Sequence, residues 1–448
     1  MNTSTTIAAI ATAPGMGAVS LIRVSGADAC EIVASIFRGR PQEKWKARSQ
    51  HFGRIVDSAG VPVDDVLMTW FPGPASFTGE DTVEIAGHGG VVVTKRILEL
   101  VLEAGAVPAE PGEFSQRAFF NGMMDLTQAE AIMDLISAST DLAARAAQEQ
   151  LSGRLGSELE EIRQKVIALL AHLEAYIDFP DEDIDPDSSA ALLSRLHEIR
   201  NAIDRLLATA DQGRILREGL CTVICGSPNA GKSSLLNLML GFDRAIVTDE
   251  AGTTRDTIEE VINLNGIPIR LIDTAGIREN AGTIEQQGIE RSKEQLARAE
   301  LILWVIDASA SAQETASIEF PENSRIVRIL NKSDLPMHAD WIGEEGLSIS
   351  CLDPATAETL RDHLYETLVK NGDINTSSLT AINARHQHCL KQAAQFFKQA
   401  GSNLELNESP EFVAMDLREG LSAIGDVIGK TDVEEILGEI FSSFCIGK

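Results

Sequence analysis

The spacing of apolar residues changes along the chain, and its first part has the pattern of an α+β domain. Up to about residue 120, short apolar runs at residues 18–22, 66–68 and 83–85 alternate with turns that contain Gly or Pro. One helical stretch, Val91 to Glu103, interrupts them. Because short apolar runs bounded by turn residues are typical of strands, this part is predicted to form an α+β domain.

Two later parts of the chain have the period of amphipathic helices. Apolar residues recur every three or four positions over residues 159–176 and 192–206, which is the spacing of one helix face. Helix-like periodicity returns after Asn375, through Phe397 and again over residues 412–444. Helices are therefore predicted on both sides of a central region with a different pattern.

That central region, residues 220–375, alternates apolar runs with helix-like segments. The predicted strands are 220–225, 267–272, 301–306, 325–330 and 347–350. Alternation of this kind is typical of a parallel sheet with helices on both faces. An α/β domain between two helical segments is most simply an insertion into a helical domain.

Composition supports several folded domains. Of the 448 residues, 44% are hydrophobic and 23% charged, which is typical of a folded protein and not of a disordered one. Single cores rarely grow beyond about 250–300 residues, so roughly three domains are expected. The net charge is −29, from 38 Lys and Arg against 67 Asp and Glu. This acidity argues against a protein that coats nucleic acid non-specifically, because phosphates must be met by cations, but it leaves room for a local basic patch.

The cysteines and the N-terminus indicate a reducing compartment. The six cysteines form no C-x-x-C pair, and their density is far below that of a disulfide-stabilised protein. No basic residue precedes Arg23, so the charged start of a signal peptide is missing. No apolar run approaches the roughly 18 residues needed to span a bilayer. A cytoplasmic protein without stable membrane insertion is predicted.

Residues 226–233, Gly-Ser-Pro-Asn-Ala-Gly-Lys-Ser, match the phosphate-binding P-loop between a predicted strand and a predicted helix. In such a loop the backbone N–H groups turn onto phosphate oxygens, Lys232 reaches the β- and γ-phosphates, and Ser233 ligates Mg²⁺. The predicted nucleotide-binding residues here are Gly226, Asn229, Ala230, Gly231, Lys232, Ser233 and Ser234.

Two further motifs follow predicted strands at the positions that a guanine nucleotide requires. After strand 267–272 come Asp273, Thr274, Ala275 and Gly276, where the Asp can hold Mg²⁺ through water and the last N–H can sense a γ-phosphate. After strand 325–330 come Asn331, Lys332, Ser333 and Asp334.

Asp334 can accept hydrogen bonds from guanine N1–H and N2–H₂ together, a contact that adenine does not offer. Ser350 follows the last predicted strand, where such proteins close the base pocket. The expected substrate is GTP.

The segment of residues 248–256, between the P-loop and Asp273, is predicted to be a switch. A Thr in such a segment completes Mg²⁺ coordination only while the γ-phosphate is present, and Thr254 is the predicted one. Ile277 follows the Asp273 motif, and Ile cannot orient water as Gln does in Ras-like proteins. The group that positions water must therefore come from elsewhere. Composition leaves three candidates: Glu279, Glu285 and Glu290.

Beyond these motifs, the chain resembles the tRNA modification GTPase family MnmE, also called TrmE, nearly from end to end. Many GTPases share the nucleotide motifs, whereas other segments are specific to the family. These are residues 23–26, 76–81, 83–85, 88–90, 111–121, 125–131 and the terminal Phe444-Cys-Ile-Gly-Lys448.

The resemblance implies a multidomain α/β architecture. Residues 1–120 would form an N-terminal α+β domain for tetrahydrofolate binding and dimerisation, and residues 121–215 and 376–448 the two parts of a discontinuous helical domain. Residues 216–375 would form an inserted Ras-like P-loop GTPase domain, the G domain, with a mixed, mostly parallel sheet.

The family's activity combines GTP hydrolysis, coupled to dimerisation of G domains, with modification of tRNA. An aminomethyl or carboxymethylaminomethyl group is installed at C5 of the wobble uridine, U34, of certain tRNAs. The resemblance implies a homodimer that works with the FAD-dependent protein MnmG (GidA) in a heterotetramer or larger complex. The one-carbon donor would be 5-formyltetrahydrofolate or a related tetrahydrofolate.

Family residues carry over to several positions of this chain. Arg23, Glu80 and Lys448 match residues that bind the folate, whereas the family usually has Lys where this chain has Met123. That difference removes a cation near the glutamate tail of the folate.

In the G domain, the resemblance selects Glu285 as the residue that helps to position water, beside Lys232 and Thr254 as catalytic residues. It also implies K⁺ in place of an arginine finger, since a fixed positive charge opposes the charge that develops in the transition state. The implied K⁺ ligands are Asn229, Thr248, Glu250 and Thr253.

Two other functions share some of these features. A ribosome-assembly GTPase would carry the same P-loop, but also a small basic RNA-binding appendage that this chain lacks. A self-sufficient one-carbon transferase, regulated by the G domain, would need no partner.

Two local features each allow two interpretations. Cys445 is either a functional thiol near the folate or tRNA chemistry or a small thiol packed behind Phe441 and Phe444. Residues 385–398 form a weakly basic helix that is either a solvated face or a place where tRNA phosphate docks. Its basic residues are Arg385, His386, His388, Lys391 and Lys398.

Overall fold

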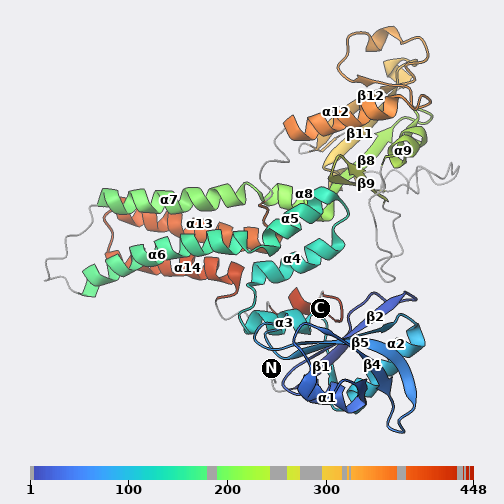
Figure 1. Cartoon of the computed structure of the whole chain (residues 1–448). Coiled ribbons are helices and arrows are strands. Elements are labelled where there is room, and N and C mark those ends of the chain that lie inside the picture. The colour runs from blue at the N-terminus through green and yellow to red at the C-terminus, as the bar shows by residue number, and fades with distance from the viewer. Residues whose placement is uncertain are drawn as a thin grey trace. The chain divides into compact units, whose positions relative to one another are not determined.

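A computed structural model describes residues 5–178, 189–242, 260–272, 295–314, 320–321, 324–370, 380–430, 437, 440–442 and 444–447. The chain divides into two compact units (Figure 1). Unit 1 comprises Met1–Met133, Gly156–Glu160 and Ser422–Lys448. Unit 2 comprises Asp134–Leu155 and Glu161–Leu421. The domain boundaries expected from the sequence stay a prediction.

Unit 1 contains a seven-stranded sheet in the order β3-β4-β5-β6-β2-β1-β7. Neighbouring strands are antiparallel, except that β1 and β7 are parallel. The strands are β1 (Ile7–Ile10), β2 (Val19–Ser25), β3 (Phe37–Gly39), β4 (Gln50–Val56), β5 (Pro62–Phe71), β6 (Thr82–His88) and β7 (Val107–Pro108).

Two helices, α1 (Ala29–Ile36) and α2 (Val91–Glu103), cover one face of this sheet (Figure 1). Buried side chains such as Ile32 and Ile97 pack there on strand residues such as Ile55 and Ile85. The helix α3 (Glu113–Phe120) and the start of α4 (Leu126–Ser137) follow. The α+β expectation is confirmed, and α2 has the bounds read from the sequence.

The chain's last residues pack within unit 1. The buried rings of Phe441 and Phe444 lie 5.2 Å apart between centroids and pack with Leu126 and Ala129 of α4. The backbone also approaches closely at Gly112, where an added Cβ would lie 2.6 Å from the carbonyl oxygen of Phe441. Segments far apart in the sequence therefore share one small core.

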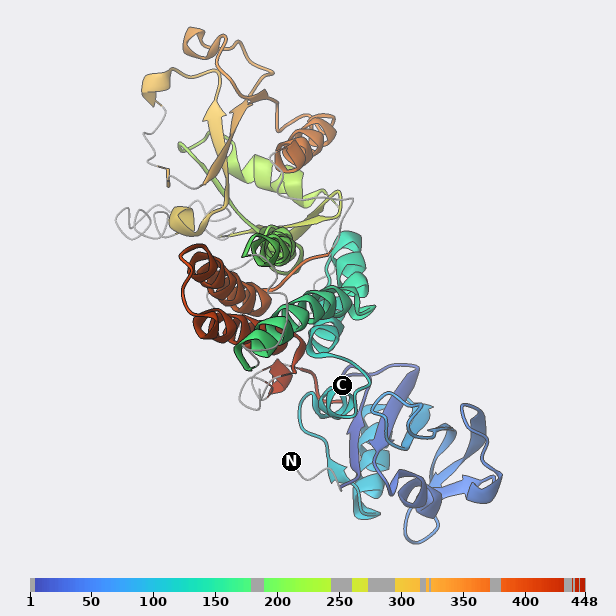
Figure 2. The ribbon, with the colours of Figure 1, turned by 90° about the vertical axis from the view of Figure 1, so that its left-hand side faces the viewer.

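Unit 2 contains helices from both sides of the nucleotide-motif region. The helix α13 lies beside α7, and Arg418 of α14 pairs with Glu174 of α6 at 2.7 Å (Figure 1; Figure 2). This pairing supports a helical layer built from two chain segments. The helices are α5 (Asp141–Leu151), α6 (Arg154–Asp178), α7 (Ser189–Leu207), α8 (Ala210–Glu218), α13 (Ala384–Glu405) and α14 (Pro410–Ile428). Residues 156–160 of α6 and 422–428 of α14 are assigned to unit 1.

Two details of these helices differ from expectation. The helix α14 ends at Ile428, before Gly429 with a φ of 78°, so the apolar period over residues 412–444 is not one helix. His386 is fully buried, where its side chain and that of Asn383 form a reciprocal cap at the start of α13. The interpretation of His386 as part of a basic face is therefore wrong.

The nucleotide motifs lie on a six-stranded sheet in the order β13-β12-β11-β8-β10-β9. All neighbouring pairs are parallel except β9 and β10, which confirms the mixed, mostly parallel sheet. The helices α9 (Lys232–Leu240) and α12 (Thr356–Lys370) pack on it (Figure 2). The strands are β8 (Leu220–Gly226), β9 (Glu260–Leu264), β10 (Ile267–Leu271), β11 (Leu301–Asp307), β12 (Arg325–Asn331) and β13 (Leu347–Ser348).

The strand β9 is absent from the sequence prediction. It pairs with β10 through the turn Asn265–Gly266, whose φ angles are 50° and 96°. Two consecutive positive φ values match the tight hairpin turn that Asn-Gly favours, so this dipeptide was the available signal. Among the described helices, none is both long enough and apolar enough to cross a membrane.

Candidate functional site

The P-loop leaves β8 at Gly226 and enters α9 at Lys232. Gly226 and Gly231 have φ angles of 150° and 102°. An added Cβ at Gly226 would lie 2.1 Å from the carbonyl oxygen of Val305, and one at Gly231 would lie 2.0 Å from Nδ2 of Asn331. Both positions therefore require Gly. The loop delivers the chain to the N-terminal end of α9, where free N–H groups favour an anion.

The ammonium of Lys232 is already held over this loop. Its Nζ donates hydrogen bonds to the carbonyl oxygens of Gly226, at 3.0 Å, and Ser227, at 2.8 Å. Partial burial lowers the pKa of Lys232, because desolvation disfavours the charged form. Burial, opposed by the charge of Lys232, raises the pKa of the Cys225 thiol to about 12, so that thiol stays protonated. Lys232 is thus a partly desolvated cation at the loop where a nucleotide phosphate is expected to bind.

Asn331 joins three loops at one edge of the sheet. Its buried amide donates from Nδ2 to the carbonyl oxygen of Ala230 at 2.8 Å and accepts at Oδ1 from the N–H of Cys351 at 3.0 Å. The strands β11 and β12 end in register, Asp307 opposite Asn331. The P-loop, the 331–334 motif and the segment with buried Ser350 therefore meet where parallel strands end, the usual ligand position in such sheets.

Asp307 is a polar residue of this site that the sequence prediction missed. Its Oδ2 lies 2.5 Å from Nζ of Lys332, and its Oδ1 accepts from the N–H and the hydroxyl of Ser309. Burial raises the pKa of Asp307, but the hydrogen bonds from Lys332 and Ser309 outweigh it and lower the pKa overall. Asp334 is exposed, so its carboxylate is accessible to a base. The position of Asp307 at a strand end was the available signal.

Several predicted site residues lie outside the described part of the chain, and their roles stay predictions. They are Thr248, Glu250, Thr253, Thr254, Asp273, Thr274, Ala275, Gly276, Glu285 and Lys448.

A second candidate site lies in unit 1, around Arg23 of β2. Its Nε and Nη2 donate to Oε1 of Glu84 at 3.0 and 2.9 Å. The guanidinium carbon also lies 5.2 Å from the ring centroid of Phe77 and 5.8 Å from that of Phe114, within cation–π range. Arg23 is therefore a largely buried cation with one carboxylate partner and two aromatic neighbours.

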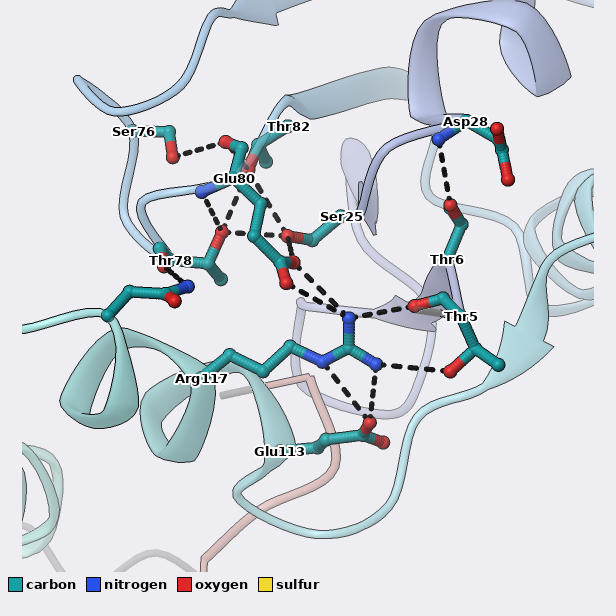
Figure 3. Close-up of polar contacts among 11 residues, drawn as sticks. Thr5, Thr6, Ser25, Asp28, Ser76, Thr78, Glu80, Thr82, Glu113 and Arg117 are labelled. Atoms are coloured by element: carbon teal, nitrogen blue, oxygen red, sulfur yellow. Dashed lines mark hydrogen bonds and ion pairs between the residues drawn. The ribbon is translucent and has the colours of Figure 1, made fainter. Parts of the chain in front are cut away.

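Glu80 is held by a buried network (Figure 3). Its carboxylate accepts from the Ser25 hydroxyl at 2.8 Å and pairs with Nη1 of Arg117 at 3.2 Å. Arg117 also pairs with Glu113 at 2.8 Å and donates to the carbonyl oxygen of Thr5 at 2.8 Å. Only 6% of the Arg117 side chain is exposed. The sequence prediction did not name Arg117, although this residue belongs to the family-like segment 111–121.

The structure brings Arg23, Glu80 and Met123 into one neighbourhood. Ser25, which donates to Glu80, lies two residues from Arg23 on β2 and thus on the same face of the strand. An added Cβ at Gly79, next to Glu80, would lie 3.2 Å from Cγ of Met123. The Met123 thioether therefore lies beside the Glu80 loop.

The C-terminal tail reaches the same region of unit 1. An added Cβ at Gly447 would lie 2.4 Å from the carbonyl oxygen of Ile10, and Ile10 adjoins Ala9, the register partner of Arg23. Cys445 is exposed, so the interpretation as a packed thiol is wrong. Its possible functional role stays a prediction.

Within the described ranges, no cluster of three or more His, Cys, Asp or Glu side chains could hold a metal ion. A P-loop at the end of β8 and an Asn-Lys-x-Asp motif at the end of β12, on a mostly parallel sheet, are the arrangement of P-loop GTPases. That is the class that the fold and the site define.

The sequence matches two family models. The model of the MnmE helical domain matches residues 126–445, and the model of the N-terminus of the GTP-binding protein TrmE matches residues 6–123. The chain belongs to the MnmE family.

Individual proteins agree with this assignment. The tRNA modification GTPase MnmE of Akkermansia muciniphila is 49% identical over 444 residues and that of Thermoanaerobacter sp. 44% identical over 457 residues, each match covering 99% of both chains. Among solved structures, the FeoB G domain from Methanococcus jannaschii is 18% identical and covers 32% of this chain and 94% of its own. Its TM-score of 0.23 is too low to support a conclusion.

Proposed function

We propose that this chain hydrolyses GTP and uses the hydrolysis in tRNA modification. The observation that carries the proposal is the Asn331 side chain, which ties the P-loop carrying Lys232 to the loops of Asp334 and Ser350. The proposed phosphate site and the proposed guanine-selective carboxylate would thereby be held at one edge of the sheet. Relatives at 44–49% identity over the full length are named tRNA modification GTPases, which supports the same activity here.

The residues of the P-loop fit the two cations that this proposal needs. Ser233 is exposed in the first turn of α9, where a hydroxyl can ligate Mg²⁺ with Thr254 as the second protein ligand. Asn229 lies in the P-loop with a φ of 61°. Because its side chain is exposed, we propose that its amide oxygen ligates K⁺. Thr248, Glu250 and Thr253 would complete that K⁺ site. The bound K⁺ would supply a fixed positive charge near the phosphates.

GTP turnover in K⁺ is expected to exceed turnover in Na⁺ by more than about tenfold, because removing one preorganised charge commonly costs 10²–10³ in rate.

Glu285→Ala should leave GTP affinity unchanged and slow hydrolysis by roughly 100-fold or more, since it would remove the group that positions water. Steady-state phosphate release and equilibrium binding of a fluorescent GTP analogue measure both effects.

Glu279→Ala and Glu290→Ala are the matched controls, because they remove the same charge from the same segment. Turnover that does not depend on the cation would contradict the K⁺ site and the coupled dimerisation of G domains. Normal turnover in Glu285→Ala would remove that residue from catalysis.

For the tRNA reaction, the proposal includes the family's partner and product. The chain would act as a cytoplasmic homodimer with FAD-dependent MnmG, installing an aminomethyl or carboxymethylaminomethyl group at C5 of U34. The alternative is a self-sufficient one-carbon transferase. Incubating the purified chain with GTP, a tetrahydrofolate donor and tRNA, with and without the partner, separates them. Nucleoside modification without the partner would favour the alternative.

The second site fits a folate in part. Arg23 offers a guanidinium beside two aromatic rings, and Arg117 and Ser25 hold the Glu80 carboxylate in place. The Arg23 guanidinium and the Glu80 carboxylate are thus preorganised for a ligand with a flat polar ring. Lys448 would add a cation from the C-terminal tail. Met123 adds none, and its thioether lies beside the Glu80 loop. We therefore propose a 5-formyltetrahydrofolate site that holds the glutamate tail weakly.

Met123→Lys is expected to tighten 5-formyltetrahydrofolate binding by about three- to fivefold, because an exposed ion pair contributes up to about 1 kcal/mol. Isothermal titration calorimetry measures the change. Met16→Lys, at a residue that is 92% exposed, adds the same charge elsewhere and should change nothing. A folate analogue without the glutamate tail should bind both variants like the unaltered chain. Equal gains in both variants would contradict the proposed placement of the tail.

A further inference from the structure

The end of β3 and the connection that follows it to β4 carry an excess of positive charge in a strongly acidic protein. Residues 38–48 contain five basic residues and one acidic residue, Glu43, whereas the whole chain has 38 basic against 67 acidic residues. We call this segment the basic loop. All five of its cations are exposed: Arg38, Arg40, Lys44, Lys46 and Arg48.

These cations are not neutralised within the part of the chain that the structure describes, where no ion pair joins any of them to a carboxylate. Arg38 donates to the backbone carbonyls of Ser35 and Phe37, and Arg48 donates to that of Ala75. By contrast, Arg96 and Arg154 elsewhere pair with Glu side chains at 3.1 and 2.8 Å. The basic loop therefore has charge available for an outside partner.

The basic loop is also ordered. Trp45 at its centre is buried, donates from Nε1 to the carbonyl oxygen of Arg40 at 2.8 Å, and contacts the Phe37 ring edge-on at 6.2 Å between centroids. The N–H of Lys46 donates to Nε2 of His51, which is buried too. Because the backbone is fixed before a partner arrives, binding would lose little backbone entropy.

An exposed aromatic ring accompanies the cations. Arg38 is the register partner of Arg54 on β4, and paired residues project to the same face of a sheet. Phe52, two residues from Arg54 on that face, is 70% exposed. Cations that meet phosphates beside a ring that stacks on a base are a common combination in RNA-binding surfaces. A partner that offers carboxylates alone would make no use of the ring.

We propose that the basic loop, with Phe52 beside it, is a docking surface for the phosphate backbone of RNA. The proposal rests on the proposed function, in which tRNA is the RNA. It identifies a local basic patch of the kind that the net charge of −29 leaves room for, because the local field at a phosphate depends on the nearest cations more than on the distant acids that salt screens.

The test compares two triple variants with the same change in net charge. Arg40→Gln/Lys44→Gln/Lys46→Gln alters the basic loop, and Arg96→Gln/Arg154→Gln/Arg328→Gln alters arginines that are each paired with a Glu. Fluorescence anisotropy with labelled tRNA, from 50 to 200 mM salt, gives affinity and its salt dependence.

Affinity of the basic-loop variant should fall by roughly 10- to 100-fold, and the slope of log K against log salt should become shallower by about 2–3, near 0.7–0.9 per lost phosphate contact. The control variant should stay within about threefold, and GTP turnover should be unchanged in both. Phe52→Ala should weaken binding several-fold without changing the slope, because stacking releases no counterions.

Equal losses in both triple variants would overturn the proposal, since total charge and not this loop would then matter. It would also be overturned if the unaltered chain bound vesicles of phosphatidylserine but not tRNA. Modification assays with the partner present separate this inference from the proposed function. If tRNA is modified while the basic-loop variant binds it normally, only the docking surface is wrong. If neither GTP turnover nor modification occurs, the proposed function itself fails.

Discussion

Lys232→Ala is expected to reduce kcat/KM for GTP by at least about 10³-fold, the largest effect on activity that the structure predicts. The Lys232 ammonium is partly desolvated and already held at the P-loop by the carbonyl oxygens of Gly226 and Ser227. A charge held in place in a partly dry site interacts more strongly with phosphate than one in water. It also needs no reorganisation when charge develops during hydrolysis.

Steady-state phosphate release and equilibrium GTP binding check this prediction. Lys430→Ala is the control, because it also removes an ammonium that the structure holds, here against Glu160 at 2.8 Å, but in unit 1 and not in the unit that contains the P-loop. Near-normal hydrolysis in Lys232→Ala would show that the loop does not bind phosphate in the proposed way.

Arg117→Met is expected to lower the free energy of unfolding of unit 1 by about 3–5 kcal/mol, the range for breaking one side of a buried ion pair. Arg117 is 6% exposed and pairs with both Glu80 and Glu113. Its removal leaves two carboxylates close together without the Arg117 counterion, and the carbonyl oxygen of Thr5 loses the hydrogen bond from Arg117. Each of these changes is unfavourable in a buried site.

Urea unfolding followed by the fluorescence of Trp45 and Trp70 reports on unit 1. A background with Trp304→Phe and Trp341→Phe removes the other two of the chain's four tryptophans. Arg96→Met breaks an exposed pair and should have little effect. Adding Glu80→Gln to Arg117→Met should restore part of the stability, since it removes one uncompensated charge. No restoration would mean that the loss comes from packing and not from charge.

The nucleotide site could be predicted from the sequence because its parts are short motifs that directly follow strands. A P-loop needs Gly where the backbone turns, and the close contacts of Gly226 and Gly231 show why no other residue fits. The carboxyl ends of parallel strands fall on one edge, so the 226–233 and 331–334 motifs had to meet. The hydrogen bond from the Asn331 side chain to the carbonyl oxygen of Ala230 joins the two motifs at that edge.

Ion-pair partners could not be predicted in this way. Asp307 pairs with Lys332, and Arg117 with Glu80, across sequence separations of 25 and 37 residues. In a chain with so many acidic residues, each cation has many candidate partners, and sheet register and helix packing choose among them. His386 likewise was assigned to a basic face because its neighbours are basic, whereas the capping geometry of α13 buries it.

By itself the sequence determined the α+β and α/β parts, the P-loop and the guanine motif, because these depend on residues adjacent in the chain. It also determined the strongly acidic balance, which needs only the composition. Only the tertiary structure decided which charges are neutralised. It placed Arg23 and Arg117 against carboxylates from distant segments and left the cations of residues 38–48 without such partners among the described residues. A net charge is a sum over the chain, whereas binding depends on the charges that folding leaves exposed and unpaired at one place.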